Sequence, residues 1–134
     1  MVKRHAQTGF TLIELLIVMA ILAMLAALVG PALFDRLDKG KQSTAASQIS
    51  QLELALDQYR LDVGHYPNSL EALVRNVDDE DGWDGPYLNR ADEVPLDPWK
   101  NEFVYSRVGR SFSLLSYGAD GVEGGEGPDA DIGK

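Results

Sequence analysis

The chain has 134 residues, no cysteine and a formal net charge of −9. Without cysteine, no disulfide can stabilise a small domain, so packing or a bound metal ion must do so. Among the first 30 residues the only acid is Glu14, and all other acidic residues follow Gly30. This acidic balance argues against nucleic acid as a partner, because phosphate binding needs a basic face.

Residues 10–30 form an apolar run whose single charge is Glu14. As a helix with about 1.5 Å rise per residue, the run would span roughly 32 Å, close to the ~30 Å of bilayer hydrocarbon. A carboxylate within lipid costs at least ~2.5 kcal/mol, so Glu14 is a candidate functional residue. Lys3 and Arg4 precede the run, which predicts a single span with a cytoplasmic N-terminus and an extracytoplasmic C-terminal domain.

The junction between Gly9 and Phe10 allows two interpretations. The apolar run could be an uncleaved signal-anchor, since it does not end in the small residues of a secretory cleavage site. Alternatively, the chain could be cut before the run, between Gly9 and Phe10. Residues 1–9 would then be a leader that is removed.

Residues 9–14, GFTLIE, resemble the signature of the type IV pilin and pseudopilin superfamily. The resemblance implies that a prepilin peptidase cuts between Gly9 and Phe10 and that the new Phe10 amine is N-methylated. It also implies that Glu14 meets the Phe10 amine of a neighbouring subunit inside a filament. Such a pairing is physically sensible, because two buried ions are tolerable only when paired.

Residues 31–64 are predicted to continue the helix beyond the membrane as an amphipathic segment. Pro31 predicts a kink or local melting, and Gly64 is placed to end the helix. The polar face, which includes Gln42 and Glu53, is expected to face solvent. The apolar face is either the core face of the domain or, less favoured, a groove for a partner. It contains Ala45, Ile49, Leu52, Leu56, Tyr59 and Val63.

Residues 65–134 are predicted to form the periplasmic globular part, with a small antiparallel sheet. Strands are expected at 103–105 and 111–117, joined by a connection at 107–110. Trp99 is expected to cover the apolar helix stripe. The whole chain is therefore expected to be α+β, with a long N-terminal helix packed on the sheet.

Further motifs resemble those of the major pseudopilins of type II secretion systems. They are Tyr66-Pro67, GPYL at 85–88 and PLDPWKN at 95–101. The two prolines that bracket Asp97 predict an extended backbone path there.

Residues 117–133 contain five carboxylates and six glycines. This composition suits either a disordered acidic tail or a loop that folds around a hard cation with oxygen ligands. The pseudopilin resemblance implies the second, a calcium ion in a C-terminal loop. The ligands it implies are the side chains of Asp120, Asp129 and Asp131 and the carbonyls of Tyr117 and Val122.

The resemblance implies a structural subunit of the bacterial inner membrane that polymerises into a periplasmic pseudopilus and helps to export folded proteins. The implied partners are other copies of the chain, the prepilin peptidase, minor pseudopilins, the inner-membrane assembly platform and, before assembly, the membrane.

A type IV pilus pilin for adhesion, motility or DNA uptake is the alternative. The lack of cysteine argues against it, because many such pilins end in a disulfide-bonded loop. An enzyme is not expected, since His65 would be the only histidine after cleavage and no nucleophile lies near it in sequence.

Overall fold

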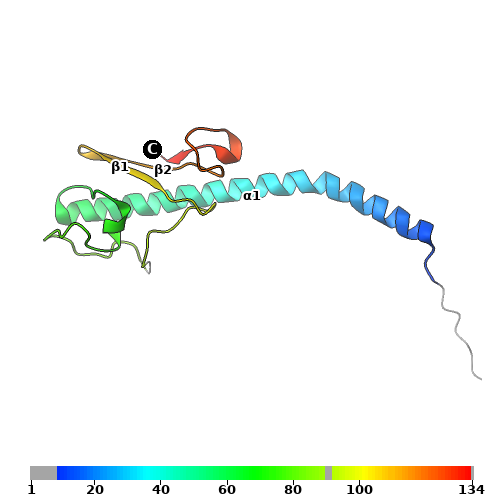
Figure 1. Cartoon of the computed structure of the whole chain (residues 1–134), viewed down its shortest axis with the longest axis horizontal. Coiled ribbons are helices and arrows are strands. Elements are labelled where there is room, and N and C mark those ends of the chain that lie inside the picture. Colours follow the sequence, from blue (N-terminus) through cyan, green and yellow to red (C-terminus); the bar gives the residue numbers. More distant parts are fainter. Residues whose placement is uncertain (1–8, 90–91, 134) are drawn as a thin grey trace, which may run out of the picture. The chain divides into compact units, whose positions relative to one another are not determined.

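The structure is a computed structural model that describes residues 9–89 and 92–133. Its main elements are one helix, α1 (Leu12–Val63), and a sheet of three strands in the order β1-β2-β3 (Figure 1). The strands are β1 (Val104–Val108), β2 (Ser111–Ser116) and β3 (Ile132–Gly133), and the short 3-10 helices are η1 (Leu70–Leu73) and η2 (Gly127–Asp129). The chain divides after Leu37 into two compact units, which are described separately.

The first unit contains the apolar start of α1. Local melting of the helix at Pro31 was a wrong expectation, because α1 continues through this residue. A proline lacks one N–H donor, and the helix accommodates Pro31 without ending there. The side chains from Phe10 to Val29 are all exposed. By length and composition this part of α1 is apolar enough to cross a membrane.

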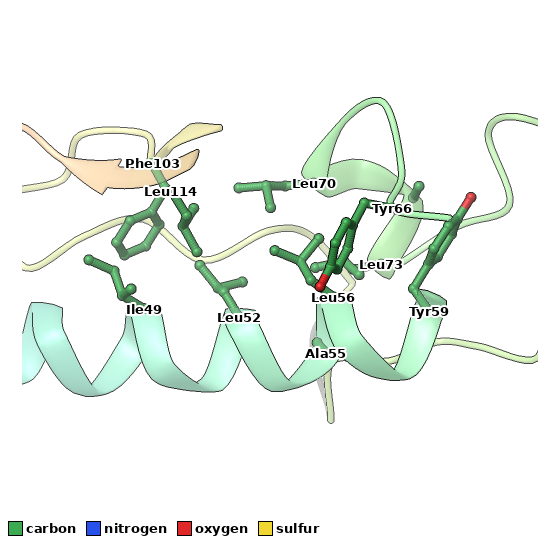
Figure 2. Close-up of a cluster of buried hydrophobic side chains, with 11 residues drawn as sticks. Ile49, Leu52, Ala55, Leu56, Tyr59, Tyr66, Leu70, Leu73, Phe103 and Leu114 are labelled. Carbon is green, nitrogen blue, oxygen red and sulfur yellow. The ribbon is translucent and has the colours of Figure 1, made fainter. Parts of the chain in front are cut away.

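The second unit has its core on the outer half of α1. The predicted stripe is buried from Ala45 to Tyr59, Val63 is half-buried, and Ala55 joins the stripe. Figure 2 shows the part of the stripe from Ile49 to Tyr59. These side chains face Phe103, which directly precedes β1, Leu114 from β2, and Leu70 and Leu73 from η1. The stripe is therefore the core face of the domain, as favoured, and not an open groove. Gly64 ends the helix with φ +94°, and its N–H bonds to the Arg60 carbonyl at 2.8 Å.

The sheet is antiparallel, and β1 is longer than predicted. Arg107 was expected in the connection but pairs with Phe112, so the turn consists only of Gly109 and Arg110. Gly109 has φ +59°, a backbone conformation that suits glycine at a tight turn. The strand β3 was not predicted, because two residues are too few to show an alternating pattern.

The tryptophan that packs on the core is Trp83, not Trp99. Trp83 contacts the core cluster, and its indole N–H donates to the Ala72 carbonyl at 2.7 Å. A Cβ at position 85 would lie 2.5 Å from the Trp83 ring, so glycine at this position leaves room for the indole. Trp99 is half-buried outside the cluster, in the turn that follows Asp97.

Candidate functional site

The start of α1 is closed by a reciprocal pair of hydrogen bonds between Thr11 and Glu14. The Thr11 N–H donates to Glu14 Oε2 at 2.9 Å, and the Glu14 N–H donates to Thr11 Oγ1 at 3.3 Å. This is a capping box, which satisfies two N–H groups that a helix start leaves unpaired. The Thr-x-x-Glu spacing could have revealed it from the sequence. The Glu14 side chain nevertheless remains exposed and open to a second partner.

The predicted cleavage point lies just before this cap. Gly9 and Phe10 are exposed and outside any helix or strand, and Phe10 is 90% exposed. A Cβ added at Gly9 would meet nothing within 4 Å. The rest of the predicted leader, residues 1–8, lies outside the described residues. The geometry therefore leaves the peptide bond between Gly9 and Phe10 accessible.

Asp97 organises the base of the acidic loop, a role that the sequence did not reveal. This carboxylate is 4% exposed and accepts from Trp99 N at 3.0 Å and Asn101 N at 2.8 Å through Oδ1. Its Oδ2 accepts from the buried Ser116 hydroxyl at 2.6 Å. The Asn101 amide in turn donates to the Gly118 carbonyl at 3.1 Å. One buried carboxylate thus connects the turn at 97–101 to the end of β2, where the loop begins.

Residues 117–131 form a loop that closes on itself. The Ala119 N–H donates to the Pro128 carbonyl at 3.0 Å. Gly118 has φ +70°, and a Cβ there would lie 2.8 Å from the Pro128 oxygen. Gln42, expected to face solvent, is half-buried, and its amide donates to the Gly127 carbonyl because the loop lies against this face of α1. These contacts favour a folded loop over a disordered tail.

The five predicted calcium ligands all belong to this loop, but their carboxylates do not converge. Asp120 Oδ1 accepts from the Val122 N–H at 3.1 Å, and Asp131 Oδ2 accepts from the Gly124 N–H at 3.0 Å. Asp129 and Tyr117 are half-buried. Within residues 9–89 and 92–133, no group of three or more His, Cys, Asp or Glu side chains is placed to hold a metal ion. The donors are of the oxygen type that calcium prefers, but the aspartate side chains would have to turn inward to share one ion.

A helix with an exposed apolar start and an outer half packed on a small antiparallel sheet defines the class of pilin-like subunits. Two family models match the chain. The prokaryotic N-terminal methylation motif matches residues 4–30, and type II secretion system protein G matches residues 32–134.

Characterised relatives match over almost the full length. The type II secretion system core protein G of Vibrio cholerae is 43% identical over 142 residues, covering 100% of this chain and 95% of its own. The protein of the same description from Pseudomonas aeruginosa is 43% identical, with 98% and 97% covered. The crystal structure of the major pseudopilin from the type 2 secretion system of enterohaemorrhagic Escherichia coli matches with a TM-score of 0.59 and 34% identity. That match covers 76% of this chain and 92% of the other.

The chain belongs to the type II secretion system protein G family, the major pseudopilins. The resemblance seen in the sequence is thereby confirmed, as is the expected packing of the long helix on a small antiparallel sheet. The methylation motif and the apolar helix indicate a subunit that is anchored in a membrane.

Proposed function

We propose that the chain is made as a single-pass inner-membrane precursor with its N-terminus in the cytoplasm and its C-terminal domain in the periplasm. A prepilin peptidase then cuts between Gly9 and Phe10, and the Phe10 amine is methylated. The match to the N-terminal methylation motif supports this sequence of events, as does the exposure of both residues. Lys3 and Arg4 support the orientation, because positive charge favours the cytoplasmic side.

The processed subunits then polymerise through the apolar start of α1. This surface supports the proposal because every side chain from Phe10 to Val29 is exposed, and contiguous apolar surface of that extent needs lipid or protein to cover it. Glu14 pairs with the methylated Phe10 amine of the next copy, which stabilises both ions in an apolar filament core. The observation that carries this step is the single exposed carboxylate within the apolar run.

Growth of the filament on the inner-membrane assembly platform, with minor pseudopilins, would push folded proteins outward. In this role the subunit is structural and not an enzyme. The family assignment supports this role, because protein G is a core component of the type II secretion system.

The mass of the protein extracted from membranes tests the processing step. The expected mass lacks residues 1–9 and includes one additional methyl group, whereas a chain that retains Met1 would contradict the proposal. A Gly9→Leu variant serves as the control. It should remain uncut yet fold normally, because an added Cβ meets nothing within 4 Å.

We also propose that the acidic loop binds calcium. The side chains of Asp120, Asp129 and Asp131 and the carbonyls of Tyr117 and Val122 would hold the ion. The oxygen donors and the closed path of the loop support this assignment, and binding would require the aspartates to turn toward one another. An ion that binds only the folded state stabilises it by RT ln(1 + [L]/Kd).

Thermal unfolding of the full chain in detergent, followed by tryptophan emission, tests the calcium site. Both tryptophans, Trp83 and Trp99, lie in the second unit. Calcium at a hundredfold excess over Kd should add about 2.7 kcal/mol, and a chelator should reverse the gain. Asp131→Asn should remove most of the calcium response, whereas the exposed Asp81→Asn should retain it. An identical midpoint with calcium and with chelator would rule out the site.

A further inference from the structure

A basic pocket lies where the end of α1 meets the β1–β2 turn. It is a cavity of about 430 Å³, and its basic lining residues are Arg60, His65, Arg107 and Arg110. Three arginines around one cavity are unexpected in a chain with 21 acidic and 12 basic residues. Guanidinium groups brought together repel one another unless an anion lies between them.

Among the residues that the structure describes, no carboxylate forms an ion pair with any of these arginines. The one ion pair within residues 9–89 and 92–133 joins His65 Nε2 to Glu80 Oε1 at 3.3 Å. Arg60 donates to the Tyr66 hydroxyl at 3.2 Å and lies over that ring, and the hydroxyl in turn donates to Asp57 at 2.9 Å.

Within the described parts of the chain, Arg107 and Arg110 have fewer hydrogen-bond and ring contacts than Arg60. Arg107 Nη1 lies 3.5 Å from His65 Nδ1. The Arg110 side chain makes no hydrogen bond or ion pair with any residue that the structure describes. Both guanidinium groups are therefore available to bind a carboxylate, to which arginine donates two parallel N–H hydrogen bonds.

We propose that this pocket receives the acidic loop of a second copy of the chain, through the carboxylates of Glu123 and Glu126. Both residues are exposed. Their side chains make no hydrogen bond or ion pair within the described parts of the chain, and neither belongs to the proposed calcium ligands. The other acidic segment, residues 78–84, is less available because Glu80 is already paired with His65.

In this structure the acidic loop and the pocket of the same subunit lie at opposite ends of β2. The pocket lies at the turn that precedes β2, and the loop begins where β2 ends, so the strand separates them (Figure 1). At about 3.3 Å per residue, the length of β2 is roughly 20 Å. A contact between two different surfaces on neighbouring copies is heterologous, the type that builds an open helical polymer. The inference therefore rests on the proposed polymerisation and assigns a charged contact to it.

Reversing charge in the pocket is the first part of the test. Arg110→Glu in the full chain, expressed with the secretion system, should lower the yield of sedimentable filaments at least tenfold. Arg75→Glu is the matched control, because Arg75 is also exposed but lies outside the pocket, and it should leave the yield unchanged. Equal losses in the two variants would mean that net charge, and not the pocket, is responsible.

Exchanging the charges is the decisive part. Arg107→Glu/Arg110→Glu and Glu123→Arg/Glu126→Arg should each abolish filaments, and the chain that carries all four changes should recover most of the wild-type yield. The docking is wrong if both double variants assemble normally, or if the combined chain assembles no better than either of them. If the docking is wrong in this way but the wild-type chain still forms filaments, the proposed polymerisation stands. If the wild-type chain itself forms no filaments, both proposals are wrong. Tryptophan-emission melting of each variant checks that the fold is retained.

Discussion

Asp97 shows how much of a local structure can depend on one carboxylate. From the sequence, the prolines on either side predict an extended path, and they give no reason for the acid between them. The structure supplies the reason, because both oxygens are buried and accept from Trp99, Asn101 and Ser116. These partners lie up to 19 residues away, so only the fold brings them together. A single sequence could not have revealed the network.

Replacing Asp97 with alanine should destabilise the second unit by about 3 kcal/mol, because buried donors would lose a charged acceptor. In a domain of this size that loss lowers the unfolding midpoint by roughly 10 °C or more. Thermal unfolding of the full chain in detergent, followed by tryptophan emission, measures the change. Asp92→Ala is the control, because Asp92 is exposed and should alter the midpoint little. If both variants melt within about 2 °C of the wild-type chain, Asp97 does not hold the loop base.

At the scale of elements, α1 was the most predictable part of the molecule. The recurrence of apolar residues every three or four positions identified five of its six buried residues, and only Ala55 was missed. Ala55 lies three residues after Leu52, but the pattern was followed through its larger neighbour Leu56, four residues after Leu52. The sheet was less predictable. Its third strand pairs only Ile132 and Gly133 with β2, and the paired residues are 16 and 18 positions apart in sequence.

We expect the same substitution to have a large effect on stability on the buried face of α1 and a small effect on its exposed face. Leu56 is fully buried in the core cluster, whereas Leu54, two positions earlier, is 66% exposed. Leu56→Ala should cost about 3 kcal/mol of unfolding free energy, through lost burial and a residual cavity. Leu54→Ala should cost less than about 0.5 kcal/mol. Chemical denaturation of the two full-length variants in detergent provides the comparison, and similar losses in both would contradict the assigned core face.

At the scale of the whole molecule, the two compact units differ in how they treat their apolar side chains. The unit from Asp38 onward has its own core, while the unit before it exposes its apolar side chains. The sequence predicted an apolar helix segment at 10–30 and an amphipathic one at 31–64, because the two follow different patterns, whereas the structure divides after Leu37. It could not place the carboxylates of the acidic loop or the arginines of the pocket, since those positions depend on the tertiary fold.

The central claim is that Glu14 acts by its charge on a neighbouring subunit. Its capping bond with Thr11 offers a competing role within one helix. Glutamine can close the same capping box but carries no charge, so Glu14→Gln separates the two roles. Thr11→Ala is the complementary control, because it removes the hydroxyl acceptor and retains the carboxylate.

The most direct measurement is therefore the filament yield of the Glu14→Gln chain, made alongside its N-terminal mass. We expect a chain that is cut after Gly9 yet forms at least tenfold fewer filaments than the wild-type chain, while Thr11→Ala still assembles. Wild-type numbers of filaments from Glu14→Gln would show that the residue acts only as a helix cap, and would contradict the account.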